Sequence, residues 1–161
     1  MGIELSTGIF ETTLDDGGRV GIPVKLRERY TGELVITNGI LPSIKCAWVM
    51  TPQVWEIAKA RFEASANILH LEEYQRMRYL FVTPAQIVEI DKVGRLLVPA
   101  AIRTYIELTK DCMVLSDTDH LEIWNTSTYQ NLGKQQQENS NALDKMGRLR
   151  LFGDLAQGAL S

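Results

Sequence analysis

The chain has 161 residues, of which 45% are hydrophobic and 23% are charged, and its net charge is -3. This composition is typical of a soluble globular protein with one ordinary domain or two small units, and the acidic balance argues against a uniformly basic nucleic-acid binder. A local basic patch remains compatible with it, since salt limits the reach of surface charges to about 10 Å.

The first segments predict a β-hairpin followed by a short helix. Residues 7–14, TGIFETTL, are rich in β-branched and aromatic side chains and predict a strand. Asp15 and Gly18 occupy the first and fourth positions of DDGG, which is typical of a type I turn. RVGI predicts the return strand, so we expect a hairpin over 7–22. Pro23 then begins a short helix, PVKLRERY.

A second strand pair and two longer helices are expected next. ELVITN and KCAWVM predict strands on either side of GILPS. Thr51 and Pro52 form a helix start, with threonine as the cap, and residues 52–64 predict an amphipathic helix. Residues 71–79 predict another helix.

The later segments repeat the order of the first ones. QIVEI predicts a strand, DKVG a turn, RLLV the return strand and PAAIRTYI a short helix. CMVLSD and HLEIW predict a hairpin, and a helix is expected to start near Thr126. The polar residues 133–141 indicate a linker or a frayed helix end. A third DKMGR at 144–148 is either a coincidence or a decayed trace of the motif.

Two segments of the chain match each other at a constant offset of 76 residues, as from Asp15 to Asp91. They are LDDGGRVGIPVKLR, from Leu14, and IDKVGRLLVPAAIR, from Ile90. Asp, Gly, Arg, Pro and a second Arg are identical, and four further positions keep their apolar character. This register indicates one supersecondary unit used twice. A unit of about 60–70 residues buries only a marginal core, so the two units gain by packing together.

Arg19 and Arg95 are candidate binding residues, because each follows a tight turn at the start of a return strand, where a hairpin can present its side chain outward. The planar guanidinium fits phosphate, or guanine O6 and N7, through two hydrogen bonds. The alternative is that each arginine only pairs with Asp15 or Asp91 to hold its turn. Both aspartates are expected to bond their own turn and to orient the arginine.

The local charge is more favourable for a phosphate contact in the second copy than in the first. Residues 90–106 carry a charge of +2, from Lys92, Arg95 and Arg103 against Asp91, in a chain whose net charge is -3. Lys92 at the turn tip is a candidate phosphate contact, with an ordinary solvated lysine as the alternative. For Arg103, and for Arg27 at the matching position, we expect ion pairing and packing.

The sequence lacks the signatures of the common enzyme and metal sites. It has no P-loop and no Gly-x-Gly-x-x-Gly after a strand. His70 and His120 lie at no metal-ligand spacing, and DTDH at 117–120 predicts a hairpin turn rather than a metal site. We therefore expect no catalytic residue, metal, cofactor or small-molecule substrate. Cys46 and Cys112 match no disulfide framework, which favours a reducing, cytoplasmic setting.

Neither a secretory leader nor a membrane span is predicted. The N-terminal residues MGIELSTGIFETT lack a basic segment followed by an apolar run. No apolar run reaches the roughly 20 residues that cross a bilayer.

The doubled Asp-x-x-x-Arg segments resemble those of the MraZ family. DHLEIW followed by a short helix is similar to the end of that family's second repeat, and Gly8 fits its N-terminal pattern. The resemblance covers about residues 7–132. Gly17 departs from it, because the family commonly carries Lys there, and the tail after residue 133 does not match closely.

The resemblance implies an α+β fold that is mainly β, namely a double-split β-barrel of two AbrB-like swapped-hairpin repeats with flanking helices. Residues 7–80 would form the first repeat with its helices, residues 83–132 the second, and residues 133–161 a tail that is expected to be helical.

The resemblance also implies a function. MraZ proteins are DNA-binding transcriptional regulators that form rings and bind short repeated sites upstream of the division and cell-wall gene cluster. Arg19 and Arg95 match the DNA-contacting arginine, Asp15 and Asp91 its paired acid, and Gly18 and Gly94 the turn. The implied partners are double-stranded DNA and further copies of the chain, in the cytoplasm at the nucleoid.

A second class of function stays open on the sequence. Related swapped-hairpin domains serve as antitoxins, which bind a toxin through an extension. The tail after residue 133 could act as such a protein-interaction segment.

Overall fold

Strands from both sequence copies lie in one antiparallel sheet. The computed structural model describes residues 7–138, which form a mixed α/β fold with five α-helices. The first copy, residues 8–50, supplies β1 (Gly8–Thr13), β2 (Arg19–Gly21), α1 (Val24–Arg27), β3 (Leu34–Asn38) and β4 (Ala47–Met50). The second copy, residues 86–125, supplies β5 (Gln86–Val88), β6 (Arg95–Leu97), α4 (Ala100–Tyr105), β7 (Asp111–Ser116) and β8 (Leu121–Asn125).

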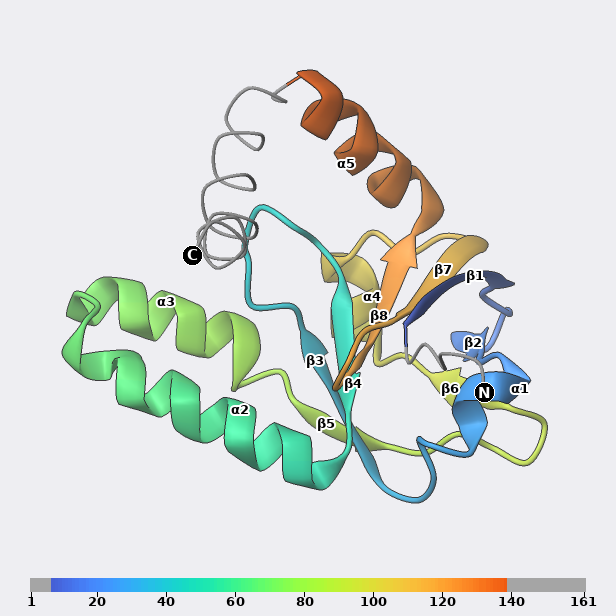
Figure 1. Ribbon diagram of the computed structural model, residues 1–161, viewed down its shortest axis with the longest axis horizontal. Coiled ribbons are helices and arrows are strands. Elements are labelled where there is room, and N and C mark those ends of the chain that lie inside the picture. Colours follow the sequence, from blue (N-terminus) through green and yellow to red (C-terminus); the bar gives the residue numbers. More distant parts are fainter. Residues whose placement is uncertain (1–6, 139–161) are drawn as a thin grey trace, which may run out of the picture. The chain divides into compact units, whose positions relative to one another are not determined.

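Each copy contributes one edge strand that pairs with a strand of the other copy. The main sheet runs β1-β7-β8-β4-β3-β5, and β2 and β6 form a separate two-stranded ribbon (Figure 1). The strand β1 therefore pairs with β7 of the second copy, and β5 pairs with β3 of the first. Neither copy completes its sheet alone, which agrees with the expectation that the copies pack together.

The hairpin expected over 7–22 forms only at its turn. Leu14 and Val20 make an isolated bridge, and the Asp15 amide donates to the Arg19 carbonyl at 2.8 Å. Beyond this point β1 and β2 separate to different partners, and Ile90 and Leu96 repeat the arrangement. The separation lets each strand place its apolar face in a core that both copies share.

The recurring apolar positions of the sequence form that shared core. Val20 and Leu96 lie opposite each other in the β2–β6 ribbon, and both are completely buried. Ile22, Leu26, Val98 and Ile102 are also buried, and Leu14 and Ile90 pack against the cluster. The matching positions thus meet at the centre of the molecule, where burying each large aliphatic side chain contributes about 1.5–3 kcal/mol.

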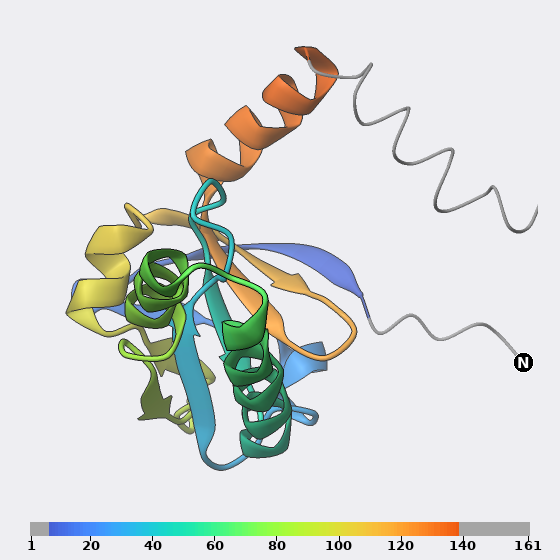
Figure 2. The same cartoon turned by 90° about the vertical axis from the view of Figure 1, so that its left-hand side faces the viewer.

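Two helices between the copies form a second, smaller cluster. They are α2 (Pro52–Ala64) and α3 (Leu71–Phe81), joined through the short 3-10 helix η1 (Ser65–Asn67). The expected cap is present, because Thr51 Oγ1 accepts a hydrogen bond from the Val54 amide at 3.4 Å. Phe62 of α2 stacks on Tyr74 of α3, and both helices pack against β3 (Figure 2).

The last described element is α5 (Thr126–Glu138), which belongs to a separate unit of the chain. Its start agrees with the helix predicted near Thr126. The DKMGR segment at 144–148 and most of the predicted helical tail lie outside the described residues. Within residues 7–138, no helix has the length and apolar character required to cross a membrane.

Two helix arginines cross from each copy to the turn glycine of the other. A side-chain carbon placed on Gly94 would lie 2.0 Å from Arg27 Cζ, and one on Gly18 would lie 1.3 Å from Arg103 Nη1. Both glycines also have positive φ, at +90° and +81°. Arg27 Nε donates to the Ile22 carbonyl at 2.8 Å, so its position is fixed. Packing of these arginines agrees with expectation, but no ion pair involving either occurs in the described part.

Gly94→Ala should lower the free energy of unfolding by more than the backbone strain alone would. Gly32 provides the matched control, because its φ is +71° and no atom lies within 4 Å of the added carbon. We expect Gly32→Ala to lower the free energy of unfolding by about 1 kcal/mol. Gly94→Ala should lower it by about 2 kcal/mol, since the Arg27 bond is also lost.

Urea unfolding of both variants measures the difference. In an Arg27→Ala background, Gly94→Ala should fall back to about 1 kcal/mol, because the guanidinium is gone. An equal cost for Gly32→Ala and Gly94→Ala in the unmodified chain would contradict the crossing contact.

Candidate nucleic-acid interface

Each motif aspartate builds the turn that carries its arginine. The Gly18 amide donates to the Asp15 carbonyl at 3.1 Å, which closes the predicted turn. Asp15 Oδ1 accepts from the amides of Gly17 and Arg19, both at 2.9 Å. In the second copy, Asp91 Oδ1 accepts from the Val93 amide at 3.0 Å and the Arg95 amide at 2.8 Å. The turn chemistry expected for both aspartates is therefore present.

The β2–β6 ribbon brings the two turns side by side. Its register pairs Arg19 with Leu97 and Gly21 with Arg95. Because Val20 and Leu96 point inward, the alternation of side chains along a strand places both arginines on the outer face. The copies are also bonded across the ribbon, from the Ile22 amide to the Gly94 carbonyl and from the Val98 amide to the Gly18 carbonyl, at 2.8 and 3.0 Å.

The two arginines differ in what holds them. Arg95 contacts both motif acids, with Nη1 at 3.2 Å from Asp15 Oδ2 and Nε at 3.3 Å from Asp91 Oδ2. Arg19 is exposed, and its guanidinium makes no hydrogen bond or ion pair within residues 7–138. It lies over Gly17, where an added side-chain carbon would be 2.7 Å from Nη1. The two alternatives for these arginines were a DNA contact and pairing with the motif acids. Pairing with the acids describes Arg95, whereas Arg19 remains available for another contact.

The acids are held in their charged form. The backbone hydrogen bond from Arg19 lowers the pKa of Asp15 most, and the charges of Arg95 and Arg19 lower it further against the effect of desolvation. The backbone bond from Arg95 does the same for the pKa of Asp91, helped by the Arg95 charge. Both carboxylates therefore remain anionic at neutral pH and can orient a guanidinium.

The turn tips carry opposite charges. Asp16 and Lys92 occupy matching, exposed positions. The first turn therefore combines two acids with Arg19, and the second combines one acid with Lys92 and Arg95. Phosphate is repelled less at the second turn, so any duplex on this face meets an asymmetric surface.

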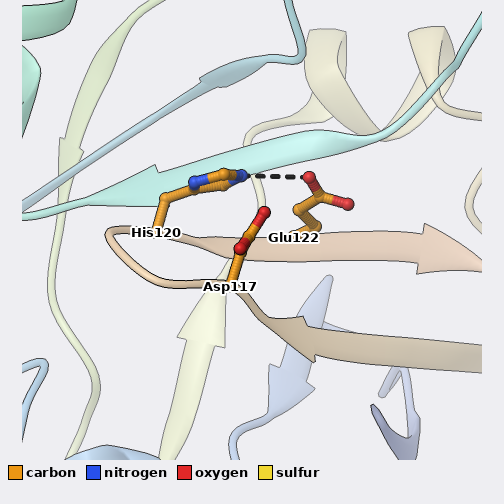
Figure 3. Close-up of side chains that lie close together, drawn as sticks. All are labelled: Asp117, His120 and Glu122. Atoms are coloured by element: carbon orange, nitrogen blue, oxygen red, sulfur yellow. Dashed lines mark hydrogen bonds and ion pairs between the residues drawn. The ribbon is translucent and has the colours of Figure 1, made fainter. Parts of the chain in front are cut away.

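The sequence DTDH favours a turn over a metal site, and Glu122 just beyond it was not considered as a ligand. Residues 117–120 form the predicted turn between β7 and β8, closed by a bond from the Asp117 amide to the His120 carbonyl at 2.9 Å. This turn brings Asp117, His120 and Glu122 together (Figure 3). The sequence did contain a sign of this group, because His120 and Glu122 are two residues apart and therefore lie on one face of the strand, beside the start of the turn.

Comparison with known proteins assigns the family. A family model described as "MraZ protein, putative antitoxin-like" matches residues 81–153. A protein of Treponema pallidum called transcriptional regulator MraZ is 32% identical over 123 residues, covering 76% of this chain and 80% of its own length. The chain belongs to the MraZ family.

Further members of the MraZ family match almost end to end. The transcriptional regulator MraZ of Treponema denticola is 31% identical over 145 residues, which cover 89% of this chain and 98% of that protein. The protein of the same name from Roseiflexus sp. is 33% identical over 144 residues, covering 89% and 97%. The resemblance seen in the doubled motif is thereby confirmed at the level of the family.

The lowered pKa of Asp15 predicts how an Asp15→Asn variant depends on pH. Asparagine keeps an oxygen for the turn amides but loses the charge that faces Arg95. A carboxyl whose pKa is depressed in the folded state stabilises the fold above its unfolded pKa, about 3.9 for aspartate. That stabilisation is lost as the pH falls through the folded value.

Urea unfolding at pH 7 and at several values below 3.9 should show this trend. We expect Asp15→Asn to be less stable than the unmodified chain at neutral pH, with the difference closing on acidification. Asp16→Asn, at an exposed neighbouring position, serves as the control for the loss of one negative charge from the same turn. A difference for Asp15→Asn that persists undiminished in acid would contradict the role of the charge.

Proposed function

We propose that this chain is a DNA-binding transcriptional regulator that contacts duplex DNA through the outer face of the β2–β6 ribbon. The observation that carries the proposal is the display of Arg19 and Arg95 on one surface by two adjoining turns. The naming of its relatives as transcriptional regulators supports it. No enzymatic activity, cofactor or small-molecule substrate is part of the proposal, and the site of action is the nucleoid in the cytoplasm.

The three basic residues have different tasks in this proposal. Arg19, whose guanidinium has no hydrogen bond or ion pair within residues 7–138, reaches the duplex and forms a two-point contact with phosphate or a guanine edge. Arg95 presents its remaining N–H groups from a fixed pose, because Asp15 and Asp91 hold its other side. Lys92 contacts phosphate from the tip of the second turn. Gly18 and Gly94 provide the backbone conformation that both turns need.

The strand exchange supports a finer description of the fold. We propose a double-split β-barrel built from two AbrB-like swapped-hairpin repeats, residues 7–80 and 83–132, followed by the tail 133–161. In support, β1 pairs with β7, β5 pairs with β3, and β2 pairs with β6, so each of these ladders joins one copy to the other.

A ring of protomers explains how an acidic chain binds DNA. A few phosphate contacts give weak binding at physiological salt. Several copies on one rigid body raise the effective concentration for each next contact, which suits short operator sites that recur upstream of the division and cell-wall genes. The acidic remainder of the surface suppresses indiscriminate attachment.

Arginine substitutions test the proposed interface. Arg19→Ala and Arg95→Ala should each weaken the gel shift of duplex from upstream of the gene, and the double substitution should abolish it. Each loss should also reduce the slope of log affinity against log salt by about one. Arg76→Ala, an exposed arginine on α3, is the charge-matched control and should bind normally.

Stability separates the two arginines. Arg95→Ala should lower the free energy of unfolding by about 0.5–1 kcal/mol, because Asp15 and Asp91 lose their shared partner. Arg19→Ala should stay within about 0.5 kcal/mol of the unmodified chain.

Unchanged DNA binding by the double variant would disprove the interface.

The alternative is an AbrB-like antitoxin or interaction module that acts through the tail, and the printed description of the family model, "putative antitoxin-like", favours keeping it. Size-exclusion chromatography with light scattering distinguishes the two. We expect a closed ring of many protomers, whose mass does not change on dilution near the working concentration. A dimer would favour the antitoxin.

A further inference from the structure

The turn between β7 and β8 gathers metal-ligand side chains that DNA binding does not use. Asp117, His120 and Glu122 each place one ligand atom within 4.8 Å of the other two (Figure 3). His120 is 8% exposed, Glu122 is half-buried and Asp117 is exposed. An ion at this point would therefore have a buried nitrogen donor on one side and access from solvent on the other.

Two of the donors lie slightly closer together than ligands of one tetrahedral ion. His120 Nε2 lies 3.0 Å from Glu122 Oε2. Nitrogen and oxygen ligands that each lie roughly 2.0–2.2 Å from a tetrahedral zinc ion are separated by about 3.4 Å. Binding would therefore replace the proton between these atoms and move them apart by about 0.4 Å.

The other polar atoms of the three residues are occupied by fixed partners. Asp119 Oδ1 lies 2.7 Å from His120 Nδ1, which selects the tautomer that leaves Nε2 free for a metal. Trp124 Nε1 donates to Glu122 Oε1 at 2.9 Å, and the Thr118 amide donates to Asp117 Oδ1 at 2.7 Å. A carboxylate on the far nitrogen of a histidine is the outer-shell arrangement that orients metal-binding histidines.

A buried hydroxyl without a partner lies elsewhere in the described residues. Tyr30 is 1% exposed, and its hydroxyl has no hydrogen-bond partner within residues 7–138. Burial raises the pKa of Tyr30 most, the Arg29 charge opposes this, and the charges of Asp119 and Asp117 raise the pKa further, so the negative charge of one proposed ligand, Asp117, acts on this hydroxyl. Buried polar groups are normally satisfied, so the hydroxyl has capacity for a further polar partner.

We propose that Asp117, His120 and Glu122 bind a zinc ion, with water as the fourth ligand. One imidazole and two carboxylates suit zinc, whereas magnesium and calcium prefer oxygen ligands alone. The positive ion also offsets the charges of Asp117, Asp119 and Glu122; of the neighbouring cations, Arg29 bonds the Thr118 carbonyl and Arg61 lines the same pocket as Asp119 and His120. Trp48 covers the imidazole, with ring centroids 4.4 Å apart.

The competing arrangement is a protonated His120 held between Asp119 and Glu122 without any metal. Burial lowers the pKa of His120, but hydrogen bonds and charges from Glu122 and Asp119 outweigh it and raise the pKa above its ordinary value. A proton and a zinc ion thus compete for Nε2, and direct measurement distinguishes them.

Calorimetric titration of the tag-free full-length chain with zinc chloride tests the proposal. We expect one zinc ion per chain, with affinity reduced at least tenfold in Asp117→Asn, an exposed turn variant that leaves the buried histidine in place. Asp111→Asn, at the opposite end of β7, is the matched control and should bind zinc normally. No binding heat, or equal affinity in Asp117→Asn, would overturn the site.

Two further measurements identify the ligands. Cobalt should give a tetrahedral spectrum without a thiolate charge-transfer band, and such a band would assign the metal to Cys46 or Cys112 instead. Zinc should raise the melting temperature of the unmodified chain and of Asp111→Asn, but raise that of Asp117→Asn less, whereas an equal rise in all three would contradict the assignment. Neither measurement involves DNA, so their outcome is independent of the proposed function.

Discussion

The structure depends on an exchange of backbone hydrogen bonds between two copies of one motif. In each copy, the carbonyl of the turn glycine accepts a hydrogen bond from the amide that follows the ribbon strand of the other copy. The left-handed glycine and the arginine that crosses it then fit together only when both copies are present. Fold and display of the outer arginines are thus two results of the same contact.

Joining the copies in one chain has freed them to differ. A symmetric pair of separate chains would carry identical turns, and each arginine would have equivalent partners. Here Arg95 contacts both motif acids while Arg19 has neither as an ion-pair partner, and Lys92 occupies the motif position that matches Asp16. A repeated motif has become a surface with two distinct halves, so the proposed contact with DNA is asymmetric.

Local sequence predicted the parts of the structure that short-range chemistry determines. Thr51 and Pro52 located the start of α2, and Asp15 with Gly18 located a turn, because caps and turns depend on neighbouring residues. The partner of β1 could not be predicted, since alternation shows that a strand has a buried face but not which strand lies beside it. The unequal pairing of Arg95 was likewise hidden, because the matching motifs predict equal roles. DTDH at 117–120 predicted a turn rather than a metal site, because its spacing fits no common zinc motif and Glu122 lies outside it.

The pairing of β1 with β7 also governs how the molecule can be made. Gly8 lies opposite Ser116 in that ladder, so β1 leaves the ribosome well before the strand that pairs with it. Contacts of such long sequence separation slow folding, and an unpaired strand is open to association with other chains in the meantime. During synthesis the edge of β1 therefore remains unpaired until β7 has emerged from the ribosome.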